Sequence, residues 1–95
     1  MITISKSTRK GKKYEATDGS KRVHFGDSNY SDFTKHGDEE RKKRYLQRHS
    51  NEDHSISNAL SPGFLAKNIL WNKRTVQASV QDLNKRYKQK FKLAT

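Results

Sequence analysis

Cysteine is absent from the 95-residue sequence, which excludes a disulfide framework and a zinc site with thiolate ligands. Long apolar runs are absent too, since no stretch approaches the roughly 20 apolar residues of a membrane-spanning helix. Residues 1–13 lack the apolar centre of a secretory signal, so we expect a protein that is not secreted and has no membrane partner. Only 29% of the residues are hydrophobic, which excludes a large enzyme with a deep pocket.

Acidic residues are scarce relative to basic ones. The chain has 21 Lys and Arg against 10 Asp and Glu, a formal net charge of +11. Residues 1–53 hold 13 basic and 9 acidic residues, a net charge of +4, whereas residues 54–95 hold 8 basic residues and the single acid Asp82, a net charge of +7. Such a field accelerates encounter with any polyanion. The C-terminal part is therefore predicted to be the more concentrated positive surface.

The length allows one small domain, whose stability we expect to be only a few kcal/mol. We predict a flexible basic arm over residues 1–11, a single α+β domain over residues 12–88 and a basic C-terminal tail over residues 89–95. An alternative for the arm is an edge strand, because Ile2 and Ile4 alternate with polar residues.

Residues 12–25 have the pattern of a β-hairpin. Apolar and polar residues alternate on both sides of Asp18–Gly19, a pair typical of tight turns because glycine adopts positive φ freely. A two-stranded hairpin is not stable alone. We therefore expect the side that carries Tyr14, Val23 and Phe25 to lie on helices.

The segment from 27 to 37 is predicted to be a polar loop, pinned to the core by Tyr30 and Phe33. A helix is predicted over residues 38–49, because acids open it and bases follow, as the helix dipole favours. Only Tyr45 and Leu46 are apolar there, so most of that helix should face water or a ligand.

Two further helices are predicted after a connector. Ser61–Pro62 is a helix start, and the helix from 62 to 71 is the most apolar segment, so it should be the centre of the core. Thr75 is a second N-cap candidate, followed by an amphipathic stripe from Val76 to Tyr87. The predicted fold is a small N-terminal β-hairpin packed on about three α-helices.

The sequence contains no motif that is typical of a catalytic or metal-binding site. The histidines His24, His36, His49 and His54 match no metal-ligand spacing, and consecutive acids on a helix point in different directions. No phosphate-cradling glycine loop and no nucleophile elbow occurs. We therefore predict no enzyme activity, no cofactor and no metal site. A small metal-dependent nuclease that uses His24, His36 or His49 remains a third alternative.

Basic residues gather in two patches, one in the helix at 38–49 and one in the C-terminal part. Lysine and arginine that neutralise phosphates release counterions and bind without reading base sequence. We therefore predict contact with a polyanion, with nucleic acid as the preferred partner; the alternative partner is an acidic protein. The predicted contacts are Arg41, Lys42, Arg44, Arg48, Lys73, Arg74, Lys85, Arg86 and Lys88.

A series of short blocks in the chain resembles a known family. The blocks are Val23–Gly26, Tyr30–Thr34 with His36, Asp38–Tyr45 with Arg48 and His49, and Leu70–Lys73. Over roughly residues 12–87 the chain resembles small uncharacterised basic proteins encoded by large DNA viruses of eukaryotes and their marine relatives. It departs from them at His54, where an aromatic residue is common, and at Arg74, where proline is common.

The resemblance implies a viral setting and no catalytic residues. It also implies a virion component or a genome-associated protein, located in the virion or in the nucleus or cytoplasm of the host cell. The hypothesis from the sequence is thus a non-catalytic viral protein that binds nucleic acid. The runner-up is a minor capsid or cement protein that contacts acidic shell proteins.

Overall fold

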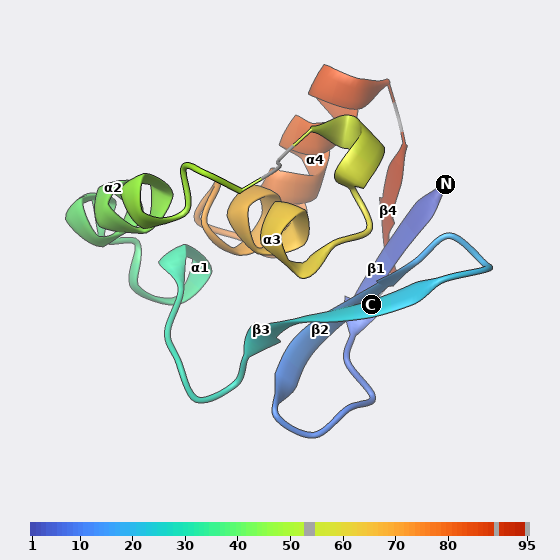
Figure 1. The fold of residues 1–95 in the computed structure, drawn as a ribbon, viewed down its shortest axis with the longest axis horizontal. Coiled ribbons are helices and arrows are strands. Elements are labelled where there is room, and N and C mark those ends of the chain that lie inside the picture. The colour runs from blue at the N-terminus through green and yellow to red at the C-terminus, as the bar shows by residue number, and fades with distance from the viewer. Residues whose placement is uncertain (53–54, 89, 95) are drawn as a thin grey trace.

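The computed structural model describes residues 1–52, 55–88 and 90–94. It has one four-stranded sheet, and the helices lie on one face of that sheet (Figure 1). The strands are β1 (Ile2–Lys6), β2 (Lys12–Thr17), β3 (Arg22–Asp27) and β4 (Phe91–Leu93), in the spatial order β3-β2-β1-β4. The first three pair antiparallel, and β4 lies parallel to β1. The α+β class predicted from the sequence is confirmed.

The predicted hairpin is confirmed as β2 and β3. Its connection is longer than the two residues of the tightest turns, because Thr17 pairs with Arg22. Asp18 holds the turn by accepting hydrogen bonds from the backbone N–H groups of Ser20 and Lys21, both at 2.9 Å. These bonds lower the pKa of the Asp18 carboxyl below its ordinary value.

The predicted arm and tail are both corrected by the pairing of strands. Strand β1 lies inside the sheet, where Ile4 is fully buried between Ala16 of β2 and Leu93 of β4. In the predicted tail, Phe91 of β4 is also buried. The physical reason is that Ile2, Ile4, Phe91 and Leu93 stand at alternate positions, so that pairing buries them on one side while the polar residues between them stay hydrated. β1 is thus a central strand rather than the edge strand that was the alternative.

Helices follow the sheet in chain order. They are α1 (Phe33–His36), α2 (Glu39–Arg48), the 3₁₀ turn η1 (Ile56–Asn58), α3 (Pro62–Leu65), the π-helical turn η2 (Ala66–Leu70) and α4 (Val76–Tyr87). The N-caps predicted from the sequence are confirmed, because Ser61 accepts from the N–H of Phe64 and Thr75 from that of Ala78. Asp38 caps α2 in the same way.

The loop predicted from 27 to 37 contains α1 at its end. Asp32 begins α1 by accepting a hydrogen bond from the N–H of Thr34 at 2.9 Å. Phe33 is buried, as expected of a residue that pins the loop. Tyr30 is 71% exposed, so the expectation that it also enters the core is wrong.

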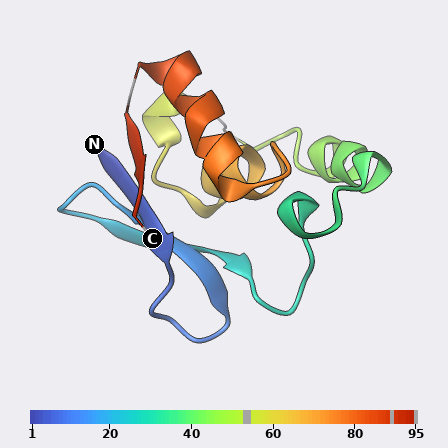
Figure 2. The same ribbon diagram turned by 180° about the vertical axis from the view of Figure 1, so that it is seen from behind.

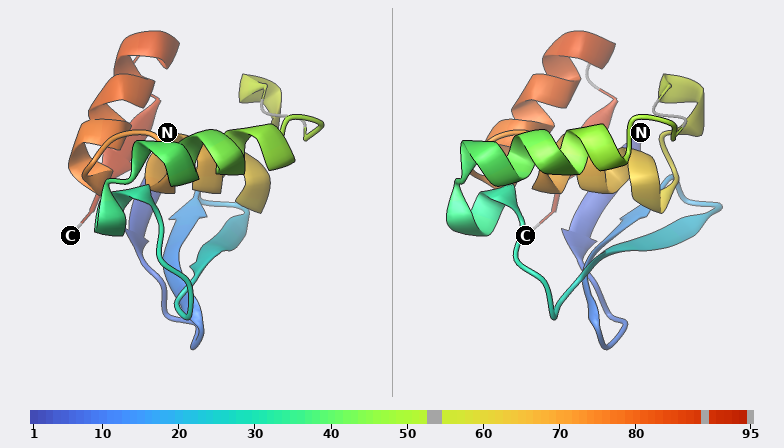
Figure 3. Two further views of the ribbon diagram at one scale, coloured as in Figure 1. Left: turned by 90° about the vertical axis from the view of Figure 1, so that its left-hand side faces the viewer. Right: turned by 60° about the vertical axis from the view of Figure 1, so that its left-hand side comes forward.

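The core lies between the sheet and the α3–η2 segment. Phe25 of β3 packs with Phe64, Leu65 and Ile69, and Leu83 of α4 completes the cluster. The helix predicted over residues 62–71 is confirmed as the centre of the core, though its second half is wound as a π-turn. Figures 2 and 3 show that α4 packs beside this segment, whereas α2 lies at the end of the molecule away from β4. Of α2, only Tyr45 is buried.

Candidate functional site

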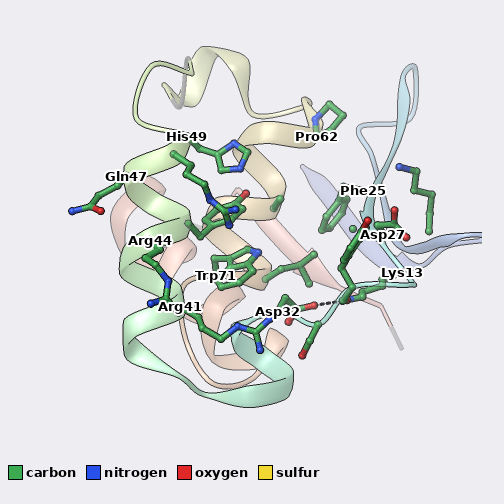
Figure 4. A pocket seen from close by; sticks show the side chains of 18 residues that line it. Lys13, Phe25, Asp27, Asp32, Arg41, Arg44, Gln47, His49, Pro62 and Trp71 are labelled. Atoms are coloured by element: carbon green, nitrogen blue, oxygen red, sulfur yellow. Dashed lines mark hydrogen bonds and ion pairs between the residues drawn. The ribbon is translucent and has the colours of Figure 1, made fainter.

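A groove of about 1190 Å³ separates α2 from β3 and the loop that follows β3 (Figure 4). One wall is α2, the other is formed by the start of β2 and the segment from Phe25 to Asp32, and α3–η2 provides the floor. On the α2 side, the buried Tyr45 and the exposed Arg41, Arg44 and Arg48 line the groove.

Arginines dominate the wall made by α2. Arg41, Arg44 and Arg48 line the groove, and their spacing of three and four residues places them on one side of the helix. All three are exposed. Within the described part of the chain, none of their side chains forms an ion pair or a hydrogen bond. Their guanidinium groups are therefore available to a ligand.

The opposite wall mixes two lysines with two acids. Lys12 and Lys13 line it together with Asp27 and Asp32. Asp32 is almost fully buried and is ion-paired with Lys13 while it caps α1, so its charge is compensated within the protein. Five cationic side chains and two carboxylates thus line the groove, a formal excess of three positive charges with His49 counted as neutral. The groove therefore favours an anionic ligand.

A cluster of aromatic rings contributes to the groove lining. Tyr45 of α2 lies parallel to Trp71, with ring centroids 4.4 Å apart and an interplanar angle of 3°. His49 covers the Tyr45 ring at 4.3 Å, and His36, outside the lining, contacts the Trp71 ring at 5.3 Å. Burial, reinforced by the negative charge of Glu52, raises the pKa of Tyr45 to about 12, with Arg48 opposing the shift. Tyr45 and Trp71 therefore add an uncharged aromatic surface to a groove whose walls carry charge.

The structure brings together three of the nine predicted contact residues, Arg41, Arg44 and Arg48. Lys42 does not line the groove, although it follows Arg41 directly in the sequence. Its Nζ donates to the carbonyl of Asn72 at 2.7 Å and lies 4.8 Å from the centroid of the Phe33 ring. These contacts tie α2 to the rest of the protein. Lys42 is thus engaged within the protein and lies outside the groove lining, and its role as a contact stays a prediction.

The other predicted residues, in the C-terminal part, do not line the groove. Arg86 donates from Nε to Asp82 at 3.1 Å and from a terminal nitrogen to Asn68 at 3.0 Å, so it is already paired. The Arg74 guanidinium lies over Gly37, the residue that ends α1. The remaining predicted contacts are exposed on the surface around α4; they are Lys73, Lys85 and Lys88. The predicted second patch is thus separate from the groove.

Several groove residues were missed at the sequence level. Lys12 and Lys13 were placed at the start of the predicted hairpin and Tyr30 in the predicted loop, and none of the three was among the predicted contacts. The adjacent lysines at the start of the hairpin were the available signal. It could not be used without knowing that this end of β2 faces α2 across the groove.

The histidines occupy different environments. His24 lies on the sheet, where its Nδ1 is 2.7 Å from Ser7 Oγ and 3.8 Å from Glu15 Oε1. Because one ring nitrogen faces both groups, the set lacks the relay geometry of a catalytic triad, which uses the two nitrogens separately. His36 and His49 belong to the ring cluster, and His54 lies outside the described residues. Among the residues described, no three His, Asp or Glu side chains are placed to hold one metal ion.

No helix within residues 1–52, 55–88 and 90–94 combines the length and apolar character that a bilayer crossing requires.

Comparison with known proteins identifies a family. A family of unknown function (DUF5754) matches residues 2–49, so the chain belongs to that family. The matched segment runs from β1 to the end of α2 and therefore includes residues of both groove walls. Trp71 of the floor lies outside it. No curated protein and no solved structure matches the chain.

Proposed function

We propose that this member of the family is a non-catalytic nucleic-acid-binding protein that holds a phosphate backbone in the groove beside α2. The observation that carries the proposal is the row of Arg41, Arg44 and Arg48, whose side chains have no partners within the described residues and face one groove. A guanidinium group binds phosphate oxygens in a bidentate manner, and a row of them matches a ligand with repeated phosphates.

The surface around α4 has a lesser role in this proposal. Its exposed lysines add to the positive field that attracts a polyanion, but they do not line the groove beside α2. Arg86 would have to leave Asp82 and Asn68 before it could bind a phosphate. We therefore assign oriented contacts to α2 and non-specific attraction to the surface around α4.

The viral setting and the location in virions stay predictions from the resemblance. The runner-up function, contact with acidic shell proteins, uses the same positive charges. It differs in the partner, because an acidic polypeptide offers carboxylates at irregular spacing rather than a regular row of phosphates. A direct competition between these two partners separates the proposals.

The test is a salt-titrated binding measurement with matched charge variants. Fluorescence anisotropy of a labelled oligonucleotide of about 20 residues is followed between about 50 and 200 mM salt. The groove variant carries Arg41→Gln, Arg44→Gln and Arg48→Gln; the control carries Lys73→Gln, Lys85→Gln and Lys88→Gln, so both lose three charges. We expect the groove variant to lose at least about tenfold in affinity and about two units of salt slope, and the control to lose less than about threefold.

Three results would overturn the proposal. The first is the absence of binding by the wild-type protein at low salt. The second is an equal loss of affinity in both triple variants, which would mean that only net charge matters. The third concerns the partner. If polyglutamate displaces the oligonucleotide at equal charge concentration, the partner is an acidic protein and the runner-up replaces the proposal.

A further inference from the structure

Tyr30 presents an unpacked ring at the rim of the groove. The residue is 71% exposed, and its ring has no stacking partner among the described residues. Its backbone is nevertheless held in place, since its N–H donates to the carbonyl of Asp27 at 3.1 Å and its own carbonyl accepts from Lys13 Nζ. A fixed backbone with a free ring is the arrangement of a stacking platform that awaits a planar ligand.

The position of this ring matters more than its exposure, because single exposed apolar residues are common on proteins. Tyr30 lies on the wall opposite α2, so the groove has unpaired arginines on one side and an unpaired aromatic ring on the other. The other rings of the groove already have ring partners: Tyr45 stacks on Trp71, and His49 covers Tyr45. Tyr30 is the aromatic of the lining that has no ring partner among the described residues.

A nucleic-acid strand has the matching asymmetry, with phosphates along one edge and flat bases along the other. We propose that the groove takes single-stranded nucleic acid, with phosphates on Arg41, Arg44 and Arg48 and one base stacked on Tyr30. This inference rests on the proposed function and specifies its ligand. A duplex does not meet the requirement, because its bases stack on one another and expose no face to Tyr30.

A binding test can separate the affinity that comes from base stacking from the affinity that comes from phosphate charge. A single strand of about 20 nucleotides is compared with a strand of equal length made of abasic residues, which keeps the phosphates and removes the bases. Wild-type protein is expected to bind the base-bearing strand about tenfold more tightly than the abasic strand. Tyr30→Ser should remove this difference, and Tyr30→Phe should retain it because the ring is preserved.

Matched controls keep the test independent of folding and charge. Ile56 is another exposed apolar residue but does not line the groove, so Ile56→Ser should bind as the wild type does. Tyr30→Ser should keep the wild-type salt slope, since no cation is lost. Trp71 is the only tryptophan of the chain and lies in the groove, so its fluorescence reports occupancy directly. Quenching of Trp71 by the base-bearing strand is expected.

The possible failures are distinguishable. If duplex and single strand bind equally and Tyr30→Ser behaves as the wild type, this inference is wrong while the proposed function stands. If no nucleic acid binds, or the triple arginine variant binds normally, the proposed function itself fails. Equal binding of the abasic and base-bearing strands by the wild-type protein also overturns the role of Tyr30.

Discussion

Helices α2 and α4 are both amphipathic and both rich in basic residues, yet the tertiary structure treats them differently. From α4, Ser79, Val80 and Leu83 are buried in the protein, whereas from α2 only Tyr45 is buried. The α2 arginines border a groove, and Arg86 of α4 is paired with Asp82. A basic helix therefore becomes a candidate binding wall only where its charges are unpaired and face a concave surface.

Net charge and groove geometry point to different regions of the chain. The C-terminal part has a net charge of +7 against +4 for residues 1–53, but the groove belongs mainly to the first part. Four of the nine acidic residues in residues 1–53 interact with groups outside the groove: Asp18 holds a turn, Asp32 and Asp38 cap helices, and Glu15 is paired with Arg22. These acids lower the regional total without neutralising Arg41, Arg44 and Arg48. The variants below test this contrast, from the largest expected effect to the smallest.

Gly26→Ala should damage the groove side most. Gly26 has a φ of 81°, and a Cβ there would lie 2.7 Å from Leu70 Cδ1 at the floor. We expect a loss of about 2 to 4 kcal/mol in the free energy of unfolding, measured by urea denaturation. Gly19→Ala is the control, since its φ is 98° but no atom lies within 4 Å, and it should cost about 1 kcal/mol. Equal costs would show that β3 does not pack tightly on the groove floor.

Tyr45→Phe should change how stability depends on alkaline pH. The pKa of Tyr45 is raised from 10.0 to about 12 by burial, so above pH 10 the unfolded state releases a proton that the folded state keeps. Unfolding is therefore favoured progressively between pH 10 and 12, by about 2 kcal/mol in total. Urea denaturation from pH 8 to 11 should show a shallower decline for Tyr45→Phe. Identical profiles would mean that the ring beneath the arginines is not buried.

Lys88→Gly should stabilise the protein and leave binding almost unchanged. Lys88 ends α4 with a φ of 57°, a conformation that glycine adopts without strain. We expect thermal denaturation to show a gain of about 1 kcal/mol. Lys88→Gln removes the same charge but keeps the strain, so it should show no such gain. A large loss of nucleic-acid affinity in both variants would move the binding site to the α4 surface.

Asp82→Asn should produce the smallest effect on binding. The hydrogen bond from Asn72 and the charge of Arg86 lower the pKa of Asp82, so its stabilising contribution is present at neutral pH and is lost as the pH falls through its lowered pKa. The variant removes the charged partner of Arg86, which keeps its bond to Asn68, and it should make the free energy of unfolding less sensitive to acid. Because Arg86 lies outside the groove, affinity should change less than about twofold. A marked gain in affinity would show that freed charge on α4 is sufficient.

Local features of the fold were predictable because their causes are local. The caps at Ser61 and Thr75, the acids that open α2 and the alternation around Asp18–Gly19 each depend on residues within a few positions of one another. The arm and tail were mistaken because β1 and β4 are stable only when paired, and their partners lie far away in the chain. Short strands flanked by lysines resemble disordered ends until that pairing is known.

The candidate site likewise combines features that the sequence determined with features that only the tertiary structure decided. The sequence determined that the protein is small, strongly basic and without cysteine, and that the segment 38–49 forms a helix with arginines on one side. Only the tertiary structure decided that this side faces a groove, that Lys42 and Arg86 are already bonded, and that Tyr30 is exposed opposite the arginines. Helical periodicity arises from backbone geometry within one segment, whereas a groove needs two segments whose distance is set by the packing of the core between them.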